Sequence, residues 1–337
     1  MGIEQQKGSP EVQTQRILVT EGENAKKKIE QYALSLKSQD VEPNNRTLPI
    51  HFFVDGDKTL FVDQSAPSIR AIEVEDPSIA REMKEIFAQF KEKHSPSPAL
   101  DKKSKKGRAV SLSLIRHGEA ADQSKEAQLS EKGRLQAEIA AYQLLFNVWS
   151  KGGGVVKLYH SPTLRAKQTF DIIQKVAERV TKKQKENPVT LYKPRMRKQV
   201  EAAGVIGPLM KAGIPYKDTV DHWIKNPKVV EGKSPSDVFA TLKPFLEVGQ
   251  TYAHELPSVG PRIFQVAVTH EVPQAALLHT LSGKTLEQIG GGIRNGEFVN
   301  IDFNPAQPHA KVHFRQADYA LPLGLRGFAG LKKATNK

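Results

Sequence analysis

The stretch SLSLIRHGEA, residues 111–120, decides the fold, because a hydrophobic strand-like run ends there directly on an arginine and a histidine. Two other segments have the same organisation, VVKLYHSPTLRAKQT at 155–169 and IFQVAVTHE at 263–271. If the three runs are neighbouring strands of one sheet, the residues at their ends meet at one edge. The sequence therefore predicts that four side chains converge on one pocket: Arg116, His117, Arg165 and His270.

The segments around these strands alternate between strand-like and helical patterns. Helical periodicity marks residues 130–149, the stretch from the second strand to about Val180, and residues 273–281, whereas residues 298–303 are β-like. Alternating strands and helices are typical of an α/β domain. We expect a three-layer structure, with a sheet covered by helices on both faces. The irregular segment 193–235 is expected to cover the sheet edge and to select the substrate.

The length of 337 residues favours more than one domain. Residues 95–108, SPSPALDKKSKKGR, combine proline, serine and basic residues, which predicts a solvated linker. We therefore expect a small N-terminal domain at 1–94, a second domain at 109–320 and a basic tail at 321–337.

The N-terminal part carries the signals of a small α+β domain. Two β-rich runs, 50–54 and 59–62, flank Asp55-Gly56, a pair typical of a hairpin turn. Asp76-Pro77 then predicts a helix start, and apolar residues follow at helical spacing. The sequence does not indicate the role of this domain.

Composition limits the classes of function. No apolar run approaches the roughly 18 residues of a membrane span, and the chain has no cysteine, so we expect a cytoplasmic protein without a membrane span. Residues 1–108 carry 18 basic and 17 acidic side chains, so the net charge of +13 lies almost wholly in 109–337. This excess predicts an anionic partner, which could be nucleic acid, a small phosphorylated metabolite or a phosphoinositide headgroup, and charge alone does not choose between them. The near-neutral charge of residues 1–108 argues against DNA binding by that part, and we expect no nucleic-acid partner.

Two guanidinium groups and two imidazoles in one pocket suit a phosphoryl group. The paired N–H donors of a guanidinium match phosphate oxygens. The chain also resembles the histidine phosphatase (phosphoglycerate-mutase-like) superfamily across roughly residues 109–315. The motifs that carry the resemblance occur in the family's order: Arg116-His117-Gly118-Glu119, Leu129-Ser130-x-x-Gly133-x-x-Gln136-Ala137, Ser161-Pro162-x-x-Arg165-Ala166-x-Gln168-Thr169 and Thr269-His270.

The resemblance implies a phosphomonoester hydrolase in which His117 attacks phosphorus and becomes phosphorylated. Arg116, Arg165 and His270 would hold the phosphoryl oxygens and offset their charge, so the resemblance implies neither a metal nor a cofactor. The resemblance also implies that His270 is a catalytic residue. A phosphomutase would share the first step, and a regulatory module would bind a phosphate ligand in the same pocket without turnover.

A general acid must protonate the leaving alcohol. Glu201 occupies a position similar to the family's acidic residue before a glycine, and we favour it. Glu271, directly after His270, is the competing candidate. Arg195, Arg197 and Lys198 are candidate contacts to an anionic substrate, whereas we expect structural roles for three other histidines: His160, His254 and His279. The physiological substrate and the oligomeric state do not follow from the sequence.

Overall fold

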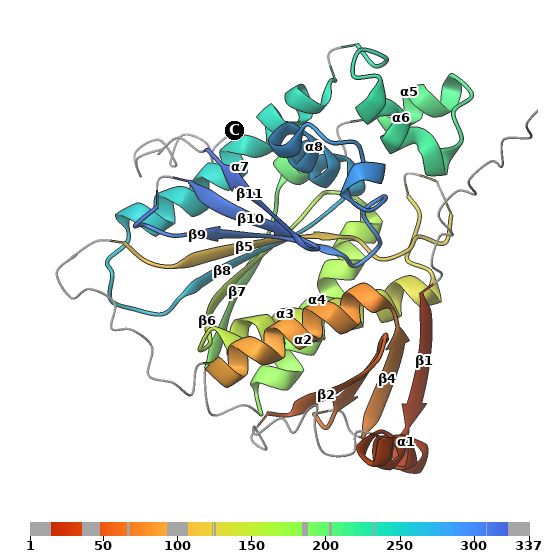
Figure 1. The fold of residues 1–337 in the computed structure, drawn as a ribbon, viewed down its shortest axis with the longest axis vertical. Coiled ribbons are helices and arrows are strands. Elements are labelled where there is room, and N and C mark those ends of the chain that lie inside the picture. The colour runs from red at the N-terminus through yellow and green to blue at the C-terminus, as the bar shows by residue number, and fades with distance from the viewer. Residues whose placement is uncertain are drawn as a thin grey trace, which may run out of the picture. The chain divides into compact units, whose positions relative to one another are not determined.

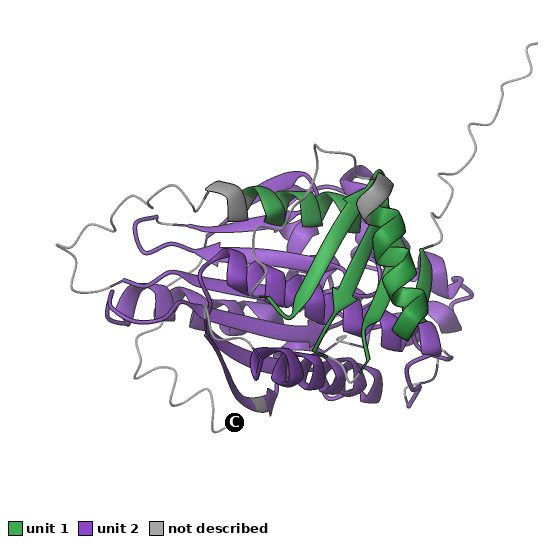
Figure 2. Ribbon diagram, turned by 90° about the horizontal axis from the view of Figure 1, so that it is seen from below, with its two compact units in different colours: residues 1–88 green, residues 89–337 purple. Residues whose placement is uncertain are grey.

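The computed structural model describes residues 15–35, 48–65, 68–92, 107–122, 124, 126–183, 188–201, 204–231, 233–307 and 309–322 (Figure 1). The chain divides into two compact units, residues 1–88 and residues 89–337, which Figure 2 draws in different colours. We call them unit 1 and unit 2. The boundary falls inside a helix, and most of the predicted linker at 95–108 lies outside the described residues. The domain limits expected from the sequence therefore stay predictions.

Unit 1 is built on an antiparallel four-stranded sheet in the order β1-β4-β3-β2. Its elements are β1 (Arg16–Glu21), α1 (Gly22–Ser35), β2 (Ile50–Asp55), β3 (Lys58–Asp63), β4 (Arg70–Glu75) and α2 (Pro77–Glu92). The predicted hairpin is present, because Asp55 pairs with Lys58 across a turn in which Gly56 has a φ of 57°. A small α+β unit precedes the larger one, as expected.

The strands of unit 1 bury side chains toward two helices. Leu60 and Val62 of β3 cluster with Ala25 of α1. Phe52 of β2 meets Phe87 of α2 edge to face, at 6.4 Å between ring centroids. Helix α2 begins where the sequence predicts, since the Asp76 side chain accepts a hydrogen bond from the amide of Ser78 at 2.9 Å.

Unit 2 is a seven-stranded mixed sheet in the order β11-β10-β9-β5-β8-β6-β7. Its strands are β5 (Val110–Arg116), β6 (Gly154–His160), β7 (Val189–Met196), β8 (Ile263–Thr269), β9 (Phe298–Phe303), β10 (Ala310–Phe314) and β11 (Ala317–Leu321). Strands β5, β8, β6 and β7 are parallel, whereas β9 runs antiparallel to β5 and starts the antiparallel edge. The predicted strands near 109–115, 155–159, 263–268 and 298–303 are all present.

Helices cover both faces of this sheet (Figure 1), so the predicted three-layer α/β fold is confirmed. Helices α3 (Glu131–Ser150) and α4 (Leu164–Thr181) pack together on one face. Helices α7 (Pro235–Glu255) and α8 (Glu271–Ser282) pack together on the other. Two shorter helices, α5 (Ile206–Lys211) and α6 (Thr219–Lys225), lie within the segment 193–235 that we expected to be irregular.

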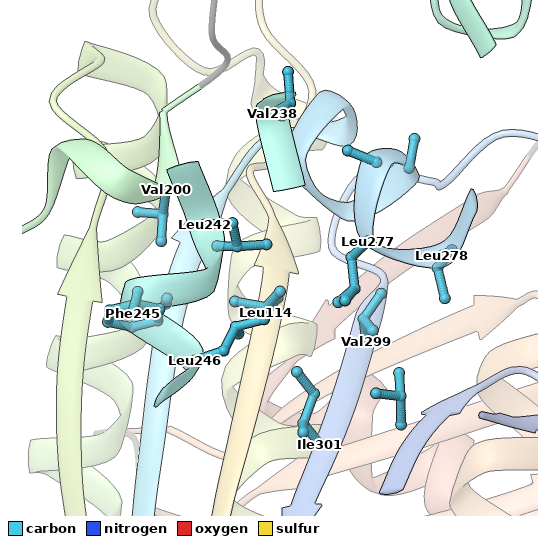
Figure 3. Close-up of a cluster of buried hydrophobic side chains, with 14 of the residues drawn as sticks. Leu114, Val200, Val238, Leu242, Phe245, Leu246, Leu277, Leu278, Val299 and Ile301 are labelled. Carbon is cyan, nitrogen blue, oxygen red and sulfur yellow. The ribbon is translucent and has the colours of Figure 1, made fainter. Parts of the chain in front are cut away.

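The main hydrophobic core of unit 2 lies between the sheet and helices α7 and α8 (Figure 3). Leu114 of β5, Leu242 and Leu246 of α7 and Leu277 of α8 are fully buried in it. The cluster also includes Val200, which precedes the proposed acid Glu201. This core fixes the central strand at the end of which His117 lies.

Three elements of unit 2 were not predicted: β7, helix α7 and the β10–β11 hairpin. Strand β7 extends into the segment expected to be irregular, because Arg195 and Met196 pair with β6. Strand β11 ends at Leu321, which is the first residue of the predicted tail, and residues 323–337 lie outside the described residues. Over the residues whose positions are given, no helix is long and apolar enough to cross a membrane.

Candidate active site

The three parallel strands bring their carboxyl ends to one edge of the sheet. Arg116 of β5 pairs with Thr269 of β8, and His160 of β6 pairs with Val268 of β8. The residues that follow these strands are therefore neighbours in space, although up to about 150 positions separate them in sequence. This register brings His117 and His270 together, with their ring centroids 4.9 Å apart.

His117 is 5% exposed, and both of its ring nitrogens have partners. Nε of Arg165 lies 3.0 Å from Nε2 of His117 and donates a hydrogen bond to it. A guanidinium can only donate, so Nε2 carries a lone pair and the proton sits on Nδ1. Nδ1 in turn donates to the carbonyl of Gly118 at 2.7 Å. The backbone thus fixes the tautomer that a nucleophilic Nε2 requires.

The loop after His117 is held against helix α3 by glycines. A Cβ atom on Gly118 would overlap the carbonyl oxygen of Gly133, and one on Gly133 would overlap the backbone of Glu119. The amide of Gly118 donates to Oγ1 of Thr169 at 3.0 Å. The side chain of Asn295 donates to the carbonyl of His117 at 2.8 Å. Close backbone packing therefore fixes the position of the nucleophile.

His270 is 3% exposed, and its ring contacts the hydroxyl groups of two residues that follow β6. Its Nε2 lies 2.8 Å from Oγ of Ser161 and 3.4 Å from Oγ1 of Thr163. Its Nδ1 is buried and has no hydrogen-bond partner among the described residues. When Ser161 donates to Nε2, the proton lies on Nδ1, which can then donate to an anion in the pocket.

The two arginines are anchored from different sides. Arg116 forms an ion pair with Glu271 at 2.9 Å and also donates to the carbonyl of Ile293. Nε of Arg116 is buried without a partner within the described part of the chain. Arg165 donates to the carbonyl of Ser124 at 3.1 Å, in addition to its bond to His117. Both guanidinium groups are held in place, and Arg116 keeps a buried N–H for an acceptor.

Burial and neighbouring positive charge hold both histidines neutral. The pKa of His117 is lowered well below its ordinary value by burial, with further contributions from His270, Arg116 and Arg165. Burial, followed by Arg165 and Arg116, lowers the pKa of His270 to about 3. Burial also lowers the pKa of the Arg165 guanidinium. At neutral pH the pocket therefore holds two positive arginines beside two neutral imidazoles, which favours an anionic ligand.

The two candidate acids occupy different surroundings. The carboxylate of Glu271 is engaged by Arg116. Glu201 follows Val200, whose carbonyl accepts a hydrogen bond from Oγ1 of Thr269 at 2.6 Å, so the backbone before Glu201 is tied to the strand end that precedes His270. The Glu201 side chain lines a polar cavity with Gln199, Gly204 and Asp237, among others. Among the described residues, no hydrogen bond or ion pair joins the Glu201 side chain to the four pocket residues.

The other expected residues lie outside the pocket. Arg195 and Arg197 line a separate cavity beside β6 and β7, and Lys198 lines the polar cavity that contains Glu201. The rings of three other histidines hydrogen-bond groups near them in sequence: His160 the carbonyl of Ser161, His254 the side chain of Gln250 and His279 the carbonyl of Lys284. The ring of His160 also contacts that of Phe170. Throughout the residues with assigned positions, no group of three histidine, aspartate or glutamate side chains could hold a metal ion.

Residues 112–187 match the family model described as "Histidine phosphatase superfamily (branch 1)". This segment of unit 2 is therefore similar to the histidine phosphatase superfamily. The match covers most of β5 and the His117 that follows it, the contact between Gly118 and Gly133, and the segment that contains Arg165. No curated protein matches the chain.

Solved structures similar to this chain share little sequence with it. "Mycobacterial hydrolase 1" is 20% identical, with a TM-score of 0.42, and the match covers 62% of this chain and 99% of that one. A mycobacterial glucosyl-3-phosphoglycerate phosphatase in complex with inorganic phosphate is 19% identical, with a TM-score of 0.40 and coverage of 61% and 97%. The protein histidine phosphatase SixA, complexed with tungstate, is 12% identical, with a TM-score of 0.35 and coverage of 62% and 96%.

Some residues that build the pocket were not identified from the sequence as contacts. Ser161 and Thr163 bond His270, which lies more than 100 positions away. Asn295 bonds His117 from the loop before β9. Ser161 was visible as part of a motif, but its partner depends on strand register. Nothing in the local sequence around Asn295 indicated its contact.

Proposed function

We propose that this protein is a phosphomonoester hydrolase that works through a phosphohistidine formed on His117. One observation carries the proposal. Nε2 of His117 carries its lone pair inside a buried pocket, because Nδ1 is bonded to the carbonyl of Gly118. That lone pair accepts from Nε of Arg165, and a phosphoryl oxygen that takes over this N–H would free it for attack. A neutral imidazole in this tautomer can act as a nucleophile without prior loss of a proton. The family match of residues 112–187 supports the same chemistry.

In the first step, Nε2 of His117 attacks phosphorus, the N–P bond forms, and the bond from phosphorus to the leaving oxygen breaks. Arg116, Arg165 and His270 surround the place where the phosphoryl group would lie. The unpaired N–H groups of Arg116 and His270 would donate to its oxygens. Their charge and hydrogen bonds stabilise the transition state, which is the main protein contribution to phosphoryl transfer.

In the second step, water attacks phosphorus and gives a proton to the carboxylate that protonated the leaving oxygen, the N–P bond breaks, and inorganic phosphate leaves. The histidine returns to its neutral state with the proton on Nδ1, since Gly118 still accepts from that nitrogen. A phosphomutase would instead return the phosphoryl group to an alcohol. A small phosphorylated molecule is the proposed substrate, since the residues of the pocket bind phosphate oxygens.

We assign Glu201 as the acid that protonates the leaving oxygen. Glu271 would have to break its ion pair with Arg116 before it could serve, and that pair orients Arg116. Glu201 forms no ion pair with any described residue, and the carbonyl of Val200, which precedes it, accepts a hydrogen bond from Thr269, next to His270. In this assignment Glu271 positions Arg116 and does not transfer a proton.

The experiment is hydrolysis of p-nitrophenyl phosphate from pH 5 to 8 with a chelator present, for wild type and His117→Ala. We expect wild-type turnover that is lost in the variant. The matched control is His279→Ala, which changes an exposed histidine of α8 and should retain activity. Phosphate binding without His117-dependent turnover would contradict the enzyme proposal and favour a regulatory phosphate-binding module. Transfer of the phosphoryl group to an added alcohol, in preference to water, would favour a mutase.

A further inference from the structure

A second cavity of unit 2 lies between the β6–β7 edge of the sheet and helix α7. Its volume is about 420 Å³, which is within the range of small-molecule sites. The residues that line it come from the two strands, the segment after β7 and one side of α7: Lys157, Leu158, Tyr159, Tyr192, Lys193, Arg195, Arg197, Gln199, Pro244, Phe245, Val248 and Tyr252. We call it the β7 cavity.

The charged residues that line the β7 cavity are all positive. Four of its lining residues are basic, and none is acidic: Lys157, Lys193, Arg195 and Arg197. None of these four forms an ion pair with any described residue. Four positive charges around one concave surface repel one another, and a negatively charged ligand relieves that repulsion.

Aromatic rings hold two of the cations in place. Nζ of Lys157 lies 4.1 Å from the ring centroid of Tyr252 and 5.9 Å from that of Tyr192. The guanidinium of Arg197 lies 5.5 Å from the ring centroid of Tyr159, which is itself buried. Cation–π contacts at these distances attract the two cationic groups to the faces of the rings. The cationic groups are therefore ordered before any ligand binds, which reduces the entropic cost of binding.

Basic residues on an edge strand also discourage pairing with other sheets, and this can explain Lys193 and Arg195 of β7. It does not explain Lys157, which lies on β6, one strand inside the edge, and is half-buried. Nor does it explain the cation–π contact of Arg197. The arrangement at Lys157 and Arg197 points to a ligand.

We propose that the β7 cavity binds a small ligand with a chain of phosphate groups, either a nucleoside polyphosphate or an inorganic polyphosphate. Several phosphates would contact the four cations together. The cavity also has an apolar wall from Leu158, Phe245 and Val248, and the ring of Tyr192 is 53% exposed. That ring can stack on the base of a nucleotide.

This site is separate from the proposed active site. None of the residues that line the β7 cavity is one of the four pocket residues at the ends of β5, β6 and β8. The two sites are linked through the backbone, because the amide of Arg197 donates to the carbonyl of His160 at the end of β6. The inference does not depend on catalysis by His117.

Calorimetric titration of the full chain carrying His117→Ala tests the proposal, with ATP, tripolyphosphate and adenosine as ligands. We expect ATP or tripolyphosphate to bind, and the double variant Lys193→Gln/Arg195→Gln to weaken that binding at least about tenfold. Both side chains are exposed, so the variant should fold. Lys157→Met should weaken binding further. The control Lys175→Gln/Lys182→Gln removes two exposed charges near α4 and should leave the affinity unchanged.

The comparison of ATP with tripolyphosphate distinguishes a nucleoside polyphosphate from an inorganic polyphosphate as the ligand. Tighter binding of ATP than of tripolyphosphate, with loss of the difference in Tyr192→Ala, would identify a nucleotide. Equal binding would identify the phosphate chain alone. The proposal is overturned if neither phosphate ligand binds. It is also overturned if binding survives the β7-cavity substitutions but disappears in Arg165→Ala, because the ligand would then occupy the active site.

Discussion

The two glutamates beside the pocket differ in their partners, and this predicts different kinetic effects. Glu201→Gln should slow hydrolysis of an alkyl phosphate by about 100-fold or more, because that leaving group needs a proton. The same change should barely affect p-nitrophenyl phosphate, whose leaving group needs none. Glu271→Gln should instead raise KM for both substrates, since Arg116 loses its ion pair. Steady-state kinetics on both substrates measure this. Equal effects of Glu201→Gln on the two would contradict its role as the acid.

The burial of His270 predicts how stability depends on pH. The pKa of His270 is about 3 in the folded protein, against about 6.5 for an unperturbed histidine. Below pH 6.5 the unfolded chain therefore binds a proton that the folded chain does not, and the free energy of unfolding falls as pH falls. The loss is at most about 1.4 kcal/mol per pH unit from this group. His117 shifts stability in the same direction.

Urea unfolding at pH 7 and pH 5 measures this dependence, and His270→Asn should show a smaller difference than wild type. His313 acts oppositely, because its hydrogen bond to Asp302 raises its pKa, and so its contribution is present at low pH. Because His313 contributes equally in both proteins, its contribution cancels when the pH dependence of unfolding is compared between wild type and His270→Asn. An unchanged difference in His270→Asn would contradict the buried, neutral state of His270.

At the scale of elements, helix α7 is held close to the sheet at Gly249. A Cβ there would lie 2.5 Å from the ring of Phe303 on β9. Gly249→Ala should therefore destabilise the protein by about 1–3 kcal/mol, although alanine is the better helix former. Gly207→Ala on α5 is the matched control, since nothing lies within 4 Å of its added Cβ, and it should stabilise by up to about 1 kcal/mol. Thermal unfolding tests both, and a stabilising Gly249→Ala would contradict this packing.

The elements also show what could be predicted from sequence. The strands that end at Arg116, His160 and Thr269 were predictable, because each is a compact apolar run followed by polar residues. The β10–β11 hairpin was not, since its turn residue with positive φ is Arg315, at 55°, where glycine or asparagine would have been the signal. Helix α7 was missed, although the capping box of Ser234 and Asp237 marks its start.

The residues of the pocket likewise divide into those that the sequence predicted and those that it did not. Arg116, His117, Arg165 and His270 were predicted to converge, because parallel strand ends share an edge, and the structure brings them together. The contacts of Ser161 and Asn295 were not predicted, since they depend on register between distant segments. The acid stays a proposal for the same reason. The position of a carboxylate in a segment with short helices cannot be obtained from strand patterns.

At the scale of the whole molecule, the net charge of +13 predicts electrostatic attraction of anionic substrates. For p-nitrophenyl phosphate, kcat/KM should fall severalfold as ionic strength rises from about 0.01 M to about 0.5 M, because the screening length shrinks from about 30 Å to less than 10 Å. The effect should appear mainly in KM. Initial rates at constant pH measure it, with a sodium chloride series and a second salt as control. Salt-independent kcat/KM would contradict this attraction.

The most direct test of the whole account is to trap the covalent intermediate. The full chain is mixed with a phosphorylated substrate, quenched in base within milliseconds to seconds, and digested for mass spectrometry, since phosphohistidine survives base. We predict a phosphoryl group on Nε2 of His117 that is absent in His117→Ala and present in His279→Ala. Turnover without any phosphorylated histidine, or phosphorylation at another residue, would contradict the account.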